Sequence, residues 1–280
     1  MADPDDLVRR PANSPDRTVR YGRHPDQVAD LWLPASVGPR ALVVVLHGGF
    51  WRARHDRAHA KPMCAALATQ GYAVCALEYR RVVQPADGWP STFDDIAAGL
   101  DAVPHLFGDL VDSDRLVLLG HSAGGHLALW GAARHRQPPG SRWRSDKPMP
   151  LAGVVSLAGV CDLELAARLR LGSDAVSSLL GDAKDTQPER YAVADPMGLI
   201  PTGINTILVH GDLDDTVPVE VSRAYAVAAR AAGDDIELRI LPGADHLSLI
   251  DPLSAAWPQV LEAVADILRS SHTQDSTISQ

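Results

Sequence analysis

One serine in this chain stands between glycines, in the run Gly120-His121-Ser122-Ala123-Gly124. Apolar runs lie directly before and after it. Glycine weakens both strands and helices, so a pair of glycines at such a junction indicates a tight turn that a side chain would obstruct. A serine on a turn from a strand into a helix projects its hydroxyl from the top of a sheet, where it can act as a nucleophile. We therefore predict Ser122 as a catalytic nucleophile.

A serine nucleophile needs a base that accepts its proton and a third group that orients the base. In this kind of strand–turn–helix site the acid and then the histidine follow the serine along the chain. Of the histidines, His210, His246 and His272 lie far enough downstream. His210 ends an apolar run and His272 lies in a polar tail, whereas His246 lies in the loop after the last apolar run. We predict His246 as the base.

The acid is expected in the segment 210–218, which reads HGDLDDTVP and offers three aspartates. Asp212 is closest to the end of the apolar run and is interpreted as a turn former. Asp215 stands shortly before Pro218 and could cap the helix that follows. We predict Asp214 as the acid.

Acyl transfer also needs donors for the negative charge that develops on the carbonyl oxygen. The stretch from His47 to Trp51, which reads HGGFW, follows an apolar run and is typical of the loop that supplies half of an oxyanion hole. We predict that the backbone N–H groups of Gly49 and Phe50, together with that of Ala123, form this hole.

These segments must be positioned by a larger framework, and the apolar pattern predicts one. Short runs rich in Val, Ile and Leu, which suit strands covered on both faces, lie at 41–47, 72–79, 115–120, 152–159, 205–211 and 236–242. Segments with helical spacing lie at 56–70, 91–103, 122–134, 218–232 and 254–269. This alternation predicts an α/β fold with a mostly parallel sheet flanked by helices. An earlier hairpin around His24 should add antiparallel edge strands.

The pattern also predicts one domain over residues 1–280, with a core at about 19–269. The segment 160–200 leaves the carboxyl edge of the sheet and should form a small cap. The ends, 1–18 and 270–280, are expected to be flexible. The polar connection 134–150, which contains Trp143, is expected to be a solvated loop.

Composition excludes several classes of partner. The net charge of −9 is unfavourable for a nucleic-acid surface. No segment approaches the roughly 18 uninterrupted apolar residues of a membrane span, so we expect a cytoplasmic protein without a membrane partner. Cys64, Cys75 and Cys161 show no metal-binding spacing and are interpreted as buried small side chains. No metal or organic cofactor is expected.

Taken together, the motifs resemble those of the α/β-hydrolase fold, from about residue 19 to 269. The stretches HGGFW, GHSAGGHLA, HGDLDDTVP and DHLSLIDP look like the branch of kynurenine formamidase (arylformamidase) and related small carboxylesterases. In that family's H-G-x-x-D-x-x-V-P pattern the acid falls on Asp214. Phe50 departs from the third glycine of lipase-like relatives, but only its N–H is required. The resemblance implies hydrolysis of a small ester or amide through an acyl-enzyme.

Substrate choice is expected to come from the cap and from aromatic side chains near the site, for which we predict Trp51 and Trp89. A small arylamine amide such as N-formylkynurenine would suit an aromatic pocket. Two other readings stay open: a peptidase like the catalytic domain of prolyl oligopeptidases, and a ligand-binding receptor that turns over slowly. A homodimer is the association state that the base rate for soluble enzymes favours.

Overall fold

The apolar runs pair into a sheet with the strand order β1-β2-β4-β3-β5-β6-β7-β8. The structure is a computed structural model that describes residues 7, 9–33, 40–84 and 87–278. The strands are β1 (Arg17–Arg20), β2 (Val28–Trp32), β3 (Arg40–Leu46), β4 (Ala73–Leu77), β5 (Val111–His121), β6 (Gly153–Leu157), β7 (Thr206–Gly211) and β8 (Ile236–Leu241). The β1–β2 and β2–β4 pairs are antiparallel and all others are parallel. The predicted architecture, including the antiparallel hairpin at the edge, is confirmed.

Both faces of the sheet are covered, and the strand sequences show why. Successive side chains of a strand point to opposite faces. In β3, Leu42, Val44 and Leu46 belong to one buried cluster, while Val43 and Val45 belong to the other. A strand with two buried faces must be apolar without interruption, and that is the pattern by which it was predicted.

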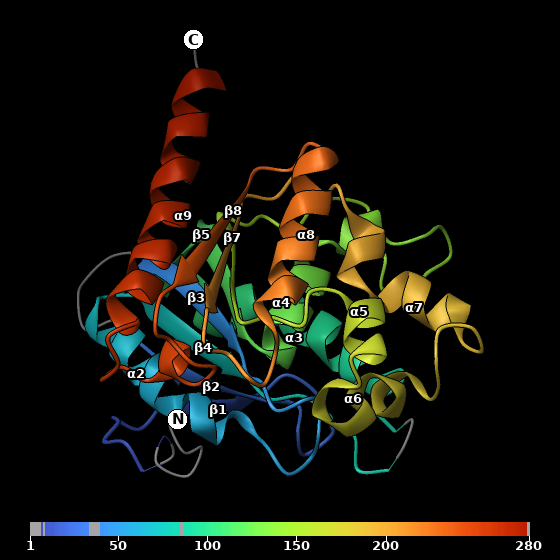
Figure 1. Cartoon of the computed structure of the whole chain (residues 1–280). Coiled ribbons are helices and arrows are strands. Elements are labelled where there is room, and N and C mark those ends of the chain that lie inside the picture. Colours follow the sequence, from blue (N-terminus) through green and yellow to red (C-terminus); the bar gives the residue numbers. More distant parts are fainter. Residues whose placement is uncertain (1–6, 8, 34–39, 85–86, 279–280) are drawn as a thin grey trace.

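The helices divide between the two faces (Figure 1). The helices α3 (Ser91–Phe107), α4 (Ala123–Ala132) and α8 (Val219–Ala231) pack on one face, and α2 (Lys61–Thr69) and α9 (Trp257–Ile278) pack on the other. In α9, Trp257, Val260, Val264 and Ile267 recur every three or four residues and face the sheet. The amphipathic spacing thus fixes which side of each helix is buried.

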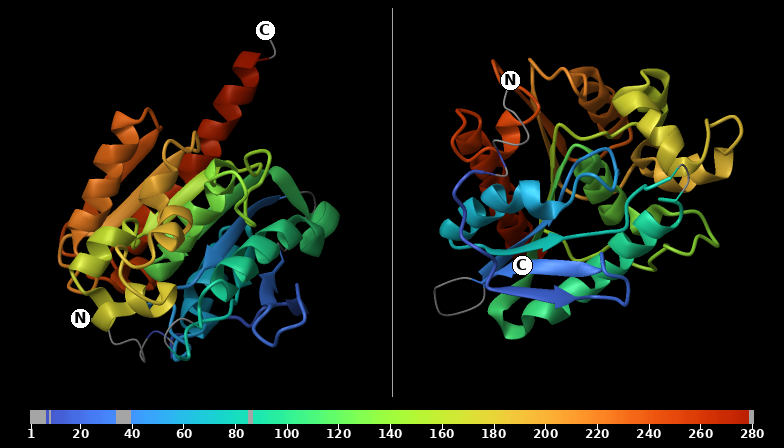
Figure 2. Two further views of the ribbon diagram at one scale, coloured as in Figure 1. Left: turned by 90° about the vertical axis from the view of Figure 1, so that its right-hand side faces the viewer. Right: turned by 90° about the horizontal axis from the view of Figure 1, so that it is seen from below.

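The predicted cap is helical. It contains α5 (Leu163–Arg168), α6 (Leu171–Leu180) and α7 (Pro188–Ala194), which lie together beside α3 and α4 in Figure 1. Figure 2 shows the β1–β2 hairpin at the edge of the sheet away from α8. The parallel strands between them all end at one edge, and the cap leaves the sheet from that edge.

The predicted flexible ends lie partly outside the described residues, which omit 1–6, 8 and 279–280, and their flexibility stays a prediction. The described parts of both ends make the following contacts. Leu7 is buried, and Arg10 pairs with Asp251 at 2.8 Å, so the early segment is attached to the body of the protein. At the other end α9 continues to Ile278, beyond the predicted end at 269, and Figure 1 shows its last turns projecting from the fold. No glycine or proline follows Pro258, so no residue in the tail interrupts the helix.

Candidate active site

Ser122 lies on the tight turn that the two glycines predict. Its backbone has φ 56° and ψ −119°, a region that residues with a side chain rarely adopt. A Cβ on Gly120 would lie 2.0 Å from the carbonyl oxygen of Gly124, and a Cβ on Gly124 would lie 1.9 Å from that of Leu46. Both positions therefore require glycine, because the turn brings backbone against backbone on either side of the serine.

The turn connects two rigid elements. Ser122 follows β5 and still donates its N–H to the carbonyl of Leu157, the last residue of β6, at 2.8 Å. Helix α4 begins at Ala123 and is buried along its whole length. The serine is consequently fixed between a strand and a helix that cannot move independently of the core.

His246 and Asp214 come from the loops after β8 and β7 and meet beyond the strand ends. His246 Nδ1 lies 2.7 Å from Asp214 Oδ2. The other oxygen, Oδ1, accepts the backbone N–H groups of Thr216 and Val217 at 2.9 and 2.8 Å. The turn after Asp214 therefore aims one carboxylate oxygen at the histidine.

The carboxylate of Asp214 is held in its charged form. Burial opposes the charge, but hydrogen bonds from His210 and His246 outweigh it and hold the pKa of Asp214 well below its usual range. His210 Nε2 lies 3.3 Å from Asp214 Oδ2. This second histidine was not predicted as part of the site, although its place at the end of β7, directly before the acid, is a signal that could have indicated it.

The neighbouring aspartates have other surroundings. Asp212 accepts the N–H of Gly243 at 2.7 Å, so it connects the loop after β7 to the loop after β8 rather than forming its own turn as predicted. The helix cap predicted for Asp215 is not formed: no side chain caps α8, which follows Pro218, and Asp215 contacts the hydroxyl of Thr216 instead. Proline at the cap position already fixes the backbone there.

Ser122 and His246 line the same cavity, of about 460 Å³, which we call the Ser122 cavity. Gly49 and Phe50 from the loop after β3 also line it. Its full lining is Leu7, Gly49, Phe50, Arg54, His55, Asp56, His59, His121, Ser122, Thr216, His246 and Leu247. The predicted nucleophile, base and loop are thus brought together around one space at the carboxyl edge of the sheet.

Four histidines line this cavity, and their surroundings differ. Burial lowers the pKa of His59 to about 4 and that of His121 well below its usual range. The pKa of His55 is lowered by burial and by Arg54. Of these four histidines, His246 is the one whose ring nitrogen lies within 4 Å of a carboxylate oxygen of the described residues, that of Asp214. The environment therefore singles out His246 as the histidine of this cavity that a carboxylate orients.

His121 contacts the predicted base, His246, through a hydrogen bond and through its ring. Its Nε2 lies 3.0 Å from the backbone oxygen of His246, to which it donates, and its ring lies 4.6 Å from the His246 ring. The Ser122 motif and the His246 loop are therefore tied together directly.

The predicted oxyanion donors lie at the cavity wall or next to it. Gly49 and Phe50 have φ values of 108° and 51°, so the loop turns sharply at both residues. Ala123 follows Ser122 at the first position of α4, where a helical N–H has no partner inside its own helix. Their role as oxyanion donors stays a prediction.

The two predicted substrate-binding tryptophans lie elsewhere. Trp51 is fully buried and packs edge-on against His126 at 5.2 Å. Trp89 lines a different cavity, of about 680 Å³, and contacts Trp143 and Phe93. Trp143 itself is buried and donates to Asp94 at 2.8 Å, so the connection 134–150 is anchored and is not simply solvated. The aromatic side chain at the Ser122 cavity is Phe50.

In the part of the chain that the structure describes, no three His, Cys, Asp or Glu side chains are grouped as a metal ion would require. None of the helices in that part has the length and apolar character needed to cross a bilayer. Cys64, Cys75 and Cys161 are buried and unpaired, as predicted.

This fold, with Ser122, Asp214 and His246 on loops at one sheet edge, defines an α/β-hydrolase. Residues 29–228 match the BD-FAE family, and the chain belongs to that family.

Curated relatives include an esterase and a methylesterase. Esterase LipC of Mycobacterium tuberculosis (strain ATCC 25618 / H37Rv) is 26% identical over 91% of this chain and 65% of its own. The probable isoprenylcysteine alpha-carbonyl methylesterase ICMEL2 of Arabidopsis thaliana is 26% identical over 93% of this chain and 63% of its own. The chain thus spans less than two thirds of the length of either relative.

Solved structures agree on the fold. Esterase B from Lactobacillus rhamnosis superimposes with a TM-score of 0.78 at 23% identity, covering 98% of this chain and 93% of its own. A truncated carbohydrate esterase from gut microbiota gives a TM-score of 0.78 at 18% identity over 93% of this chain and 100% of its own. At this level of identity the likeness shows the fold alone. The finer resemblance to kynurenine formamidase stays a prediction.

Proposed function

We propose that the chain is a serine carboxylesterase that cleaves a small ester through an acyl-enzyme on Ser122. The observation that carries the proposal is the 2.7 Å contact between His246 and Asp214 at the cavity that Ser122 lines. The esterase names of the curated relatives support the same class.

In the proposed mechanism the Nδ1–H of His246 donates a hydrogen bond to Asp214, which leaves Nε2 unprotonated and able to act as the base. The Ser122 oxygen forms a bond to the ester carbonyl while its proton passes to Nε2. Asp214 stabilises the imidazolium, and the oxyanion accepts hydrogen bonds from the N–H groups of Gly49, Phe50 and Ala123. The intermediate then expels the alcohol, which takes the proton from Nε2. Water repeats the sequence on the acyl-enzyme and releases the acid.

An ester is favoured over an arylformamide by the lining of the Ser122 cavity. The formamide expectation came from the motif resemblance, and an aromatic pocket would have suited such a substrate. Trp51 and Trp89, the two tryptophans predicted for that pocket, do not line this cavity. The same machinery can cleave a C–N bond, so the comparison is a measurement. We expect kcat/KM for p-nitrophenyl acetate to exceed that for N-formylkynurenine; the reverse ranking would restore the arylformamidase reading.

The central test is Ser122→Ala. We expect it to lower hydrolysis of p-nitrophenyl acetate by about 10⁴- to 10⁶-fold, as for other serine nucleophiles. Ser270→Ala, on the exposed face of α9, is the control and should leave the rate unchanged. A Ser122→Ala enzyme that keeps more than about a tenth of the activity would remove the assignment. A wild-type enzyme that binds esters without turnover would favour the receptor reading.

A further inference from the structure

A second carboxylate–histidine pair lies directly behind the oxyanion loop. Glu78 follows β4 and is 2% exposed, and His47 follows β3 and is 1% exposed. His47 Nε2 lies 2.9 Å from Glu78 Oε1. The proposed mechanism does not use either side chain, and two polar groups buried this deeply are costly unless both are fully partnered.

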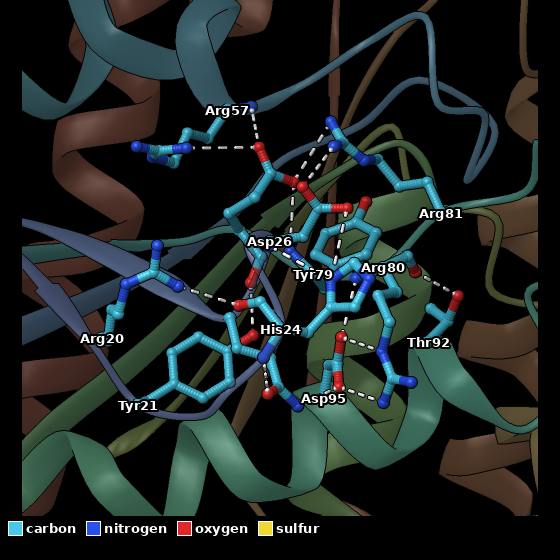
Figure 3. A network of polar contacts seen from close by, with 12 residues as sticks. Arg20, Tyr21, His24, Asp26, Arg57, Tyr79, Arg80, Arg81, Thr92 and Asp95 are labelled. Carbon is cyan, nitrogen blue, oxygen red and sulfur yellow. Dashed lines mark hydrogen bonds and ion pairs between the residues drawn. The ribbon is translucent and has the colours of Figure 1, made fainter.

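Glu78 is surrounded by donors. Its Oε1 accepts the N–H of Tyr79 at 3.0 Å, and its Oε2 accepts the N–H of Arg57 at 3.0 Å. The guanidinium groups of Arg57 and Arg81 lie at 3.5 and 3.3 Å. Figure 3 labels three of the residues that contact Glu78, namely Arg57, Tyr79 and Arg81. Burial raises the pKa of Glu78, but its partners, His47 first, overcome this effect and lower the pKa to about 2.

His47 is fixed on every side. Its ring stacks on the Tyr79 ring at 4.4 Å, and the Tyr79 hydroxyl donates to the His47 carbonyl at 2.8 Å. Its Nδ1 lies 2.8 Å from the carbonyl oxygen of Gly48. A carbonyl oxygen and an ionised carboxylate can only accept, so both ring nitrogens act as donors.

The carbonyl that His47 contacts belongs to the same peptide unit as the N–H of Gly49. In a trans peptide the C=O and N–H point in opposite directions, so fixing one end orients the other. A charged donor on the oxygen also polarises the amide and strengthens its N–H as a donor. The Gly49 N–H is the group that the proposed function assigns to the oxyanion.

We propose that the buried Glu78–His47 pair orients and polarises the Gly48–Gly49 peptide, which makes Glu78 a positioning residue for oxyanion stabilisation. The inference rests on the proposed function. Under this proposal the protein has two carboxylate–imidazole pairs. Asp214 orients the base, His246, and the Glu78–His47 pair orients the oxyanion donor.

The test is Glu78→Gln, which preserves shape and removes the charge. Removing a whole oxyanion donor costs about 10²- to 10³-fold in kcat, and here the donor stays but loses its support, so we expect a loss of about 10- to 100-fold. KM for p-nitrophenyl acetate should change by less than about threefold, because the ground-state carbonyl depends little on the hole. The inhibition constant of a trifluoromethyl ketone, whose adduct carries an oxyanion, should rise in parallel with the loss in kcat.

The matched control is Asp95→Asn. Asp95 is also fully buried and is labelled in Figure 3. In the described part of the chain its carboxylate bonds to Gln27 and to Arg80, at 2.6 Å for the closest contact, and not to the oxyanion loop. It should lose thermal stability while keeping kcat. An equal fall in kcat for both variants, or a Glu78→Gln enzyme with unchanged kcat, would show that Glu78 has only a structural role.

If Glu78→Gln does not fold, the Glu78–His47 pair can still be tested in the wild-type protein. Nitrogen-15 NMR of the ring, assigned by difference from His47→Gln or by selective labelling, should find protons on both nitrogens of His47. A single protonated nitrogen would overturn the ion pair. If the wild-type enzyme hydrolysed no ester, the proposed function would fail while this spectrum still reported on the pair.

Discussion

At the scale of single residues, the acid of the site is selected by the backbone that follows it. Asp214 has one oxygen occupied by two backbone N–H groups and the other directed at His246. Asp215, its neighbour in sequence, points instead to the Thr216 hydroxyl. Because consecutive side chains on a turn point in different directions, only one of the two aspartates can serve the histidine.

This difference predicts opposite outcomes for two variants. Asp214→Asn should lower kcat for p-nitrophenyl acetate by about 10⁴-fold, because an amide there favours the wrong histidine tautomer. Asp215→Asn should stay within a few fold of the wild type. Steady-state kinetics at pH 8 measure both, and the reverse ranking would transfer the acid to Asp215.

The pH dependence of kcat/KM in the wild type is a second check on the role of Asp214. The pKa of Asp214 is lowered, so its carboxylate is charged at every pH above its usual value near 4, and it protonates only below that. A fall in kcat/KM between pH 8 and 5 therefore comes from another group. In Asp214→Asn this carboxylate is gone at all pH values, so raising the pH should not restore its rate.

Residue types predicted the site better than they predicted its walls. The serine, histidine and aspartate each stand at the end of an apolar run, and a parallel sheet brings such ends to one edge. The position of Trp51 and Trp89 in sequence predicts that they lie near that edge, but a large apolar side chain is placed by the packing of neighbouring elements. The Trp51 side chain is buried in the core and the Trp89 ring packs against Trp143. Local sequence spacing indicates neither orientation.

At the scale of elements, the cap rests on the oxyanion loop. Arg52 donates hydrogen bonds to the backbone oxygens of Gly172 and Ser173 at the start of α6. The Phe50 ring lies under Gly172, where a Cβ would come within 2.6 Å of it. Gly172 has φ 58°, which a residue with a side chain tolerates poorly. The position of the cap and the shape of the loop are therefore coupled.

This contact predicts that Gly172→Ala lowers kcat/KM several-fold, because the new methyl group must displace Phe50 or the cap. Gly203→Ala is the matched control: it has φ 67° and an added Cβ would meet nothing within 4 Å. The strained backbone should cost both variants about 1 kcal/mol in the free energy of unfolding, and Gly172→Ala should lose more than Gly203→Ala because its methyl group also displaces Phe50; urea unfolding measures both. Equal kcat/KM values for the two variants would mean that the loop does not depend on the cap.

At the scale of the whole molecule, the sheet and its order of helices follow from the sequence pattern, whereas contacts between distant parts do not. Strands that are buried on both faces read as short, unbroken apolar runs, which can be recognised directly in the sequence. In contrast, Arg10 and Asp251 are separated by most of the chain, and no local signal pairs them. The attachment of the early segment and the anchoring of Trp143 depend on such contacts, which explains why both segments were expected to be free.

Leu7 lies in the early segment that Arg10 attaches to the body of the protein. It is buried in the hydrophobic cluster that contains α2 and α9, and it also lines the Ser122 cavity. Leu7→Ala should therefore lower the free energy of unfolding by about 2 kcal/mol or more, the usual range for a buried leucine. It should also raise the kcat/KM ratio of p-nitrophenyl hexanoate over acetate several-fold, because the truncation widens the cavity. Leu253→Ala, at a side chain that is 71% exposed, should change neither quantity. If Leu7→Ala changed stability alone, Leu7 would belong to the core but would not shape the substrate site.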